Sequence, residues 1–224
     1  ICGYKPDTVS KLEHYIPDSD IFIYQPIKNY TYEAENNVLD RLKSHTKKIC
    51  FPSLYADLWP LFPEQGGIVG GHIVDRYRKQ GHSLERIQQL YREGLLNFDL
   101  QKRFEACINY MITKEQLYCD IQATGFILDN YKTQRLFDTQ NHLSPALAYY
   151  IAQKIYESVT LEPLDTVKAA PSSIDGLWRF NKYTERELGI QYQESYDDNL
   201  YLHGIEVAYK QPEMIKYKAQ YVGF

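Results

Sequence analysis

Short apolar runs and longer polar or amphipathic stretches alternate along this 224-residue chain. Residues 21–24 and 49–51 are continuous apolar runs, which are typical of strands buried in a parallel sheet. The polar segment 33–45 lies between them and is predicted to form a helix. This strand–helix–strand order predicts an α/β fold in which helices flank a parallel sheet.

Helical periodicity indicates further helices on both sides of these strands. Ser83 is a good N-cap for one of them, because its hydroxyl can accept a backbone N–H of the first turn. The apolar stripe of residues 98–118 is expected to face the core. Residues 121–128 fit either a helix end or a strand. The other predicted helices span residues 7–14, 73–79 and 146–159.

Residues 52–72 break every regular period, because three prolines and two Gly-Gly pairs interrupt the segment. We expect turns in a long loop, and long ordered loops are often functional. This loop carries Tyr55, Asp57 and Trp59, which we take as candidate substrate-binding residues. The alternative is that Asp57 is a turn residue and Trp59 packs over the core.

The chain changes character after Leu161, where prolines and serines are typical of a linker-like stretch. The last fifty residues are polar and aromatic, with a short helix predicted near residues 212–221. They contain too few aliphatic residues for a second core. We therefore predict a single α/β domain over residues 1–224, with residues 162–224 as an irregular C-terminal extension packed on it.

Composition narrows the classes of function. A hydrophobic content of 44% supports a sizeable core, and a net charge of −4 argues against a nucleic-acid binder. The sequence shows no apolar stretch of the roughly 20 residues that span a membrane and no signal peptide. The four cysteines match no zinc or disulfide pattern. We therefore expect a cytoplasmic protein without a metal, of unknown oligomeric state.

Residues 135–145 carry the most concentrated candidate chemistry. A short apolar run ends in a polar cluster containing Thr139, Asn141 and His142. Pro145 then begins a helix, since its missing N–H costs nothing at the first helical position. We expect a strand-to-helix loop, at the sheet edge where α/β proteins bind ligands. Histidine transfers protons well near neutral pH, although His142 would instead pack beneath a turn capped by Asn141 if its role were structural.

Three loops would meet at this edge if the strands are parallel: the one around Cys2, residues 52–59 and residues 138–144. A thiol, a histidine and an amide suit an acyl-transfer site, as nucleophile, base, and orienting group or oxyanion donor. A helix N-terminus would favour the thiolate of Cys2. The alternative is a terminal cysteine with no role.

One segment resembles the signature of a known family. Residues 135–142 have the sequence RLFDTQNH, which is similar to the RLFxTxNHP signature of WcbI-like capsular polysaccharide biosynthesis enzymes, with Leu143 in place of the proline. Residues 20–26 and 51–60 resemble the family's second strand and its proline-rich strand exit. The resemblance covers nearly the whole chain. It implies an α/β fold distantly like SGNH hydrolases, coenzyme A binding, and a proposed acetyl transfer onto a capsule sugar.

The resemblance and the residues together predict acyl transfer from coenzyme A to a glycan or sugar precursor. His142 would be the general base on the acceptor hydroxyl, with Asn141 and Thr139 orienting it or donating to the oxyanion. Cys2 would correspond to the family's cysteine, and Arg135 joins the candidate substrate-binding residues. A basic helix face could meet the coenzyme A phosphates, or could simply be solvated; its residues are Arg76, Arg78 and Lys79.

Two other functions are compatible with the sequence. An SGNH-like carbohydrate esterase would remove acyl groups, but Asp138 lies four residues before His142, not the three that such hydrolases favour. A non-catalytic glycan- or nucleotide-binding module would use tyrosine-rich walls, and the chain has 21 tyrosines. A buried His142 far from any pocket would favour the binding module.

Overall fold

The computed structural model describes residues 16–26, 38–58, 62–64, 67–162, 182–192 and 198–216. The chain divides into two compact units, the first with residues 1–54, 111–125 and 148–169, the second with residues 55–110, 126–147 and 170–224. The strands are β1 (Ile21–Tyr24), β2 (Lys47–Cys50), β3 (Phe62–Glu64), β4 (Gly67–Val69) and β5 (Ile215–Lys216). The helices are α3 (Gly71–Lys79), α4 (Leu84–Arg92), α5 (Leu100–Tyr118), α6 (Thr124–Asn130), α7 (Pro145–Thr160), α8 (Lys182–Leu188) and α9 (Asp198–Lys210), with 3₁₀ turns η1 (Ile16–Asp18), η2 (Val38–Arg41) and η3 (Pro212–Met214).

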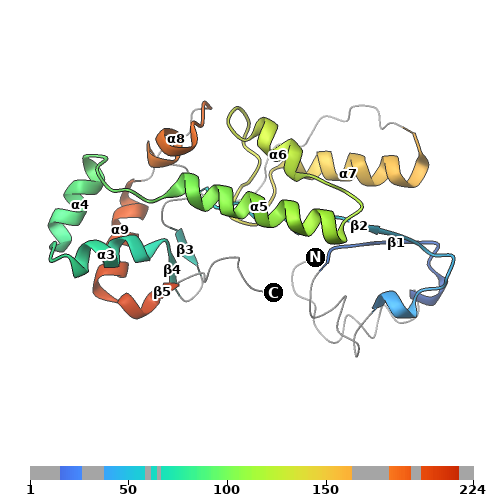
Figure 1. Ribbon diagram of the computed structural model, residues 1–224, viewed down its shortest axis with the longest axis horizontal. Coiled ribbons are helices and arrows are strands. Elements are labelled where there is room, and N and C mark those ends of the chain that lie inside the picture. Colours follow the sequence, from blue (N-terminus) through green and yellow to red (C-terminus); the bar gives the residue numbers. More distant parts are fainter. Residues whose placement is uncertain are drawn as a thin grey trace. The chain divides into compact units, whose positions relative to one another are not determined.

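In the first unit, β1 and β2 pair in parallel, from Ile21 opposite Lys47 to Tyr24 opposite Cys50 (Figure 1). Asp120 anchors the end of β2, since its carboxylate accepts the Cys50 N–H at 2.8 Å and its own N–H donates to the Cys50 carbonyl at 2.9 Å. The predicted parallel pairing and α/β class are thus confirmed.

Two details of this unit differ from the sequence expectation. Residues 38–41 form a 3₁₀ turn where a longer helix was predicted, and residues 33–37 lie outside the described part of the chain. The side chains of Ile21 and Ile23 are 41% and 45% exposed, so β1 is not buried on both faces. Within the described residues β1 pairs with β2 alone, and an apolar run cannot reveal how many faces are covered.

The helices follow the predicted periodicity closely. The Ser83 hydroxyl accepts the Arg86 N–H at 3.2 Å and caps α4, as expected. The ambiguous segment 121–128 belongs largely to α6. The buried Glu115 carboxylate accepts the N–H groups of Ala123 and Thr124 at 2.9 and 3.0 Å, which satisfies donors at the start of that helix. The helix predicted over residues 7–14 lies outside the described residues.

The second unit contains a three-stranded sheet that the loop prediction missed. Strands β3 and β4 form an antiparallel hairpin, and β5 lies parallel to β4. Pro63 is tolerated in β3 because β3 lies at the edge of the sheet that the described residues form, where a missing N–H breaks no ladder. The second Gly-Gly pair does mark a turn, since Gly70 precedes α3 with a φ of 82°.

The C-terminal extension is more regular than its composition suggested. It contributes α8 and α9, and α9 packs against α3 and α4 (Figure 1). Tyr91 stacks with Tyr183 and Tyr201 at centroid distances of 5.3 and 6.3 Å. Tyrosine rings therefore supply the core surface that a count of aliphatic residues overlooks. The helix expected near 212–221 is, over the described residues, a 3₁₀ turn followed by β5.

Gly71 lies where α3 approaches the C-terminal segment most closely. A Cβ at this position would lie 3.1 Å from Ile215 Cγ1 and 3.2 Å from Ala208 Cβ. We expect Gly71→Ala to lower the free energy of unfolding by about 1 kcal/mol, because overpacking forces neighbours to shift. The matched control is Gly125→Ala in α6, where the described residues leave open space and the better helix propensity of alanine should add up to ~1 kcal/mol. Equal effects in urea unfolding would contradict this packing.

Candidate active site

The segment around His142 is a tight hairpin, which corrects the expected strand-to-helix loop. Phe137 and Leu143 form an antiparallel bridge, and the Asp138 N–H donates to the His142 carbonyl at 2.8 Å. The chain thus turns back on itself before α7 begins at Pro145. The Ser144 hydroxyl accepts the Leu147 N–H at 3.5 Å, so the predicted helix start is confirmed. We call residues 136–144 the histidine hairpin.

A hydrogen-bond network fixes the imidazole of His142. Thr139 Oγ1 lies 2.6 Å from His142 Nδ1, accepts the His142 N–H at 3.3 Å, and donates to Asn141 Oδ1 at 3.5 Å. When the threonine hydroxyl donates to Asn141, His142 Nδ1 carries the proton that it shares with Thr139. The lone pair of the neutral ring is then on Nε2, which is the nitrogen that can act as a base.

The side chains of the histidine hairpin differ in their exposure to solvent. Asn141 and His142 are exposed, whereas Asp138, Thr139 and Gln140 are buried. An exposed imidazole held by a buried hydroxyl is available to a substrate and yet has a fixed orientation. The interpretation of His142 as a packed core histidine is therefore wrong.

Arg135 stabilises the histidine hairpin through two hydrogen bonds to backbone carbonyls and a contact with the Asp138 carboxylate. Its guanidinium donates to the carbonyls of Phe137 and Asp138, both at 3.1 Å, and lies 3.6 Å from the Asp138 carboxylate. Asp138 is 1% exposed and faces Arg135, while the ring nitrogen Nδ1 of His142 is held by Thr139. The geometry makes Arg135 a support of the hairpin, and its predicted contact with substrate stays a prediction.

The loop after β2 lies against the histidine hairpin. The Ala56 N–H donates to the Gln140 carbonyl at 2.8 Å, so two of the three loops expected to meet do meet. Tyr55 is half-buried, and its carbonyl accepts the Cys107 thiol at 3.1 Å. Cys2 and Trp59 lie outside the described residues.

Asp57 forms a buried ion pair with Arg103, a residue that the sequence analysis did not select. Arg103 Nη2 lies 2.5 Å from Asp57 Oδ1, and Nε lies 3.1 Å from Oδ2. The two side chains are 13% and 10% exposed. The sequence did contain a signal for Arg103. This basic residue directly precedes Phe104, which is buried on α5, and a charged side chain next to a buried position usually has a partner.

His72 ends the irregular segment 52–72, lies in the first turn of α3, and was not chosen as a candidate site residue. Burial lowers the pKa of this imidazole below 6.5, and the nearby guanidinium groups of Arg103 and Arg76 lower it further. Asp99 and Asp57 oppose this shift. His72 is therefore a neutral ring at pH 7 beside the Asp57–Arg103 pair.

This depressed pKa gives His72 a pH-dependent effect on stability. The unfolded chain protonates this histidine near its ordinary pKa of 6.5, while the folded chain resists protonation. The free energy of unfolding should therefore fall as pH is lowered from about 7 to about 5. His72→Gln should flatten this dependence relative to His203→Gln, which alters an exposed histidine on α9. Identical pH profiles for the two variants in urea unfolding would contradict a neutral His72.

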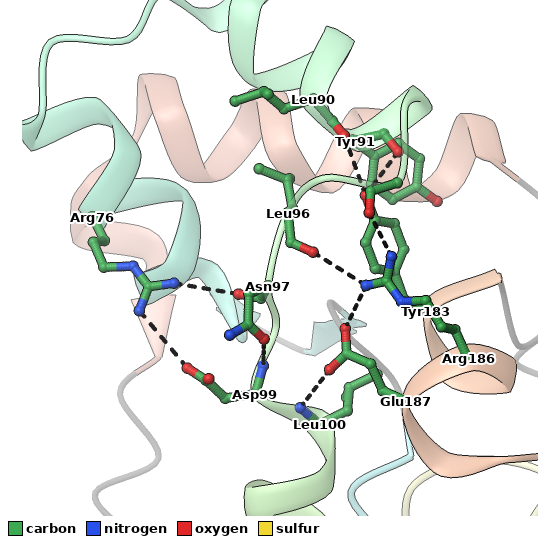
Figure 2. Close-up of polar contacts among 11 residues, drawn as sticks. Arg76, Leu90, Tyr91, Leu96, Asn97, Asp99, Leu100, Tyr183, Arg186 and Glu187 are labelled. Carbon is green, nitrogen blue, oxygen red and sulfur yellow. Dashed lines mark hydrogen bonds and ion pairs between the residues drawn. The ribbon is translucent and has the colours of Figure 1, made fainter.

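The three basic residues of α3 all have acidic partners. Buried Asp75 lies 2.7 Å from both Lys79 and Arg78, and hydrogen bonds from Lys79 and then Arg78 hold the Asp75 pKa below its usual value. Arg76 donates to the Asn97 carbonyl at 3.3 Å and lies 3.7 Å from the Asp99 carboxylate (Figure 2). Their role towards coenzyme A phosphates stays a prediction.

The described residues show no group of three or more His, Cys, Asp or Glu side chains placed to hold a metal ion. No helix among them is long and apolar enough to cross a membrane. Among the described residues, Cys50, Cys107 and Cys119 form no disulfide, and the first two are buried.

An α/β fold with an exposed, oriented histidine on a supported hairpin is typical of an enzyme. Comparison with known proteins identifies the family. The chain belongs to the family described as polysaccharide biosynthesis enzyme WcbI, whose model matches residues 2–164. The resemblance inferred from the sequence is thereby confirmed.

A solved structure of WcbI, described as a novel polysaccharide biosynthesis enzyme, resembles this chain with a TM-score of 0.69 and 17% identity. The similarity covers 94% of this chain and 79% of that one. That structure is described as the native protein without a disulfide bond between coenzyme A and one of its cysteines. The likeness shows a shared fold. No curated protein matches the chain.

Proposed function

We propose that this chain transfers an acyl group, which we take to be acetyl, from coenzyme A to a hydroxyl of a glycan or sugar precursor. The family belongs to polysaccharide biosynthesis, and the description of the similar solved structure mentions coenzyme A. The observation that carries the proposal is the Thr139–His142 contact of 2.6 Å, which leaves the basic nitrogen of an exposed ring available.

In this mechanism, His142 Nε2 accepts the proton of the acceptor hydroxyl as its oxygen attacks the thioester carbonyl. The new C–O bond forms, the C–S bond breaks, and the proton passes from His142 to the departing sulfur. Thr139 stabilises the imidazolium by accepting from Nδ1–H. No proton or electron pair is left over, and the histidine returns to its neutral form.

Asn141 is placed to stabilise the charge that develops on the carbonyl oxygen. Its Oδ1 accepts the Thr139 hydroxyl, which directs the Nδ2 hydrogens away from the network on the exposed side of the hairpin. An oriented amide of this kind can donate to an oxyanion. The acyl group passes directly between donor and acceptor in this scheme, and Cys2 would add an acyl-enzyme step only if its thiol reached His142.

The two alternative functions have weaker support. A hydrolase of the SGNH type relies on an aspartate that orients its histidine, whereas Asp138 faces Arg135 and Thr139 occupies Nδ1 of His142. A binding module needs no oriented, exposed imidazole. Coenzyme A is a cytoplasmic co-substrate, so we place the reaction in the cytoplasm, with a glycan or sugar nucleotide as the second substrate.

Coenzyme A binding is the first experimental test. We expect calorimetry at sub-millimolar ligand to show heat, and a saturating ligand to raise the melting temperature by mass action. Arg76→Gln should weaken binding about tenfold if its guanidinium meets a phosphate. Arg92→Gln, which alters an exposed arginine on α4, is the matched control. Absence of both heat and thermal shift would contradict the proposed donor.

A further inference from the structure

An open groove of about 560 Å³ lies beside the start of α5. It is lined by the α4–α5 connection, by Gln101, Lys102 and Glu105 on α5, and by Arg186 and Glu187 on α8. These lining residues all belong to the second unit. None of them was selected as a site residue from the sequence.

The α4–α5 connection that forms one wall is held from two sides (Figure 2). From α8, the Arg186 guanidinium donates to the carbonyls of Gly94 at 2.5 Å and Leu96 at 3.4 Å. From α3, Arg76 donates to the Asn97 carbonyl. A wall fixed in this way is preorganised, which lowers the conformational entropy lost when a ligand binds.

The start of α5, which also lines the groove, is held in place by Glu187. The Glu187 carboxylate accepts the Leu100 N–H at 3.0 Å and the Arg186 guanidinium at 3.0 Å (Figure 2). One side chain thus satisfies an N–H of the first helical turn and fixes the neighbouring arginine. These two contacts hold the start of α5 from within the chain.

This groove is separate from the Asp57–Arg103 pair. Gln101 and Glu105 are four residues apart on α5 and share one face of the helix, while Arg103 is two residues from each and projects to the opposite side. The Asp57–Arg103 pair therefore lies on that opposite side of α5. Asp57 follows Ala56, whose N–H bonds the Gln140 carbonyl, so this side is the one near the histidine hairpin. A ligand in the groove would occupy a second subsite.

The charges of the groove nearly cancel. Arg186 pairs with Glu187, and Asp99 pairs with Arg76. Lys102 and Glu105 then contribute one charge of each sign. A phosphate-rich ligand such as coenzyme A calls for a surplus of cations, which this groove lacks, so its lining favours a neutral ligand.

The lining presents hydrogen-bonding groups of both kinds beside an apolar surface. Within the described residues, the Lys102 ammonium is unpaired, and Gln101 donates to Glu105 at 2.7 Å, which leaves the Gln101 carbonyl as an acceptor. The Leu95 side chain is 60% exposed at the groove. Sugar hydroxyls both donate and accept, and the C–H face of a sugar ring covers apolar surface.

We propose that this groove binds a neutral saccharide segment of the glycan acceptor, at a distance from the hydroxyl that reacts. The inference rests on the proposed function, because it assumes that the acceptor is a glycan. A long acceptor held at two places gains affinity through effective concentration. The groove would thereby select extended acceptors over monosaccharides.

The test is titration of the chain with maltohexaose and cellohexaose, followed by nuclear magnetic resonance. We expect shifts in the amides of the α4–α5 connection and the start of α5. Leu95→Ser and Glu105→Ala should each weaken hexasaccharide binding about five- to tenfold. Leu128→Ser is the matched control, since Leu128 is 43% exposed on α6 and does not line the groove.

Each outcome decides between the proposals. Hexasaccharide binding that is lost in Leu95→Ser and kept in Leu128→Ser supports the saccharide site in the groove. This result would stand even if coenzyme A did not bind and the proposed acyl transfer were wrong. Absence of hexasaccharide binding, equal binding by all variants, or stronger binding of an anionic hyaluronan hexasaccharide would overturn the groove proposal, even if coenzyme A binds.

Discussion

His142→Ala is expected to lower turnover in acyl transfer by about 10²–10⁴-fold, which is the typical contribution of a general base. The fold should remain intact, because the imidazole is exposed and its main contact is with Thr139. His142→Gln should be nearly as slow, since glutamine keeps a hydrogen-bonding side chain but accepts no proton near neutral pH. Transfer from acetyl-coenzyme A to a glycan acceptor measures the effect, with circular dichroism in parallel.

The control for His142 is His203→Gln, which alters an exposed histidine on α9 and should leave turnover unchanged. Near-normal turnover in His142→Gln would show that the residue anchors substrate and does not act as a base. Thr139→Val should also lower turnover, because the ring would lose the hydroxyl that fixes its orientation.

Arg103→Met is expected to lower the free energy of unfolding by about 3–5 kcal/mol, because it leaves the Asp57 carboxylate buried without its cation. The double variant Asp57→Asn, Arg103→Met should recover most of this loss, since no net charge then remains buried. Denaturant unfolding followed by fluorescence measures both variants.

The matched control for Arg103→Met breaks an exposed ion pair by the same kind of substitution. Lys43 and Asp18 lie 2.9 Å apart with side chains 45% and 80% exposed, so Lys43→Met should change stability little. Equal effects of the two substitutions would show that the Asp57–Arg103 pair is solvated. Loss of this pair should also weaken turnover, because Asp57 is adjacent in sequence to Ala56, which bonds the histidine hairpin.

Local patterns predicted the local structure of this chain. Periodicity identified α3, α5 and α7, and cap chemistry identified Ser83 and the proline start of α7, because neighbouring residues decide these features. The apolar runs at β1 and β2 predicted a parallel pair correctly. The helices and their caps need no knowledge of distant contacts, whereas the β1–β2 pair joins residues 26 positions apart and was inferred from the order of the elements.

The parts that sequence reasoning missed depend on contacts between distant residues. Arg103 gains its partner 46 positions away, and β5 pairs with β4 across most of the second unit. The histidine hairpin forms because Phe137 and Leu143 pair with each other, where the polar cluster between them suggested an open loop. Thr139, Asn141 and His142, which the sequence proposed as site residues, lie together on the histidine hairpin.

The most direct test is transfer of isotopically labelled acetyl from acetyl-coenzyme A, with mass spectrometry of the acceptor and a thiol assay for released coenzyme A. The proposed mechanism predicts one acetyl ester on the glycan for each coenzyme A released, at a rate that collapses in His142→Gln. Release of coenzyme A matched by free acetate, with no gain of mass on any glycan acceptor, would contradict it.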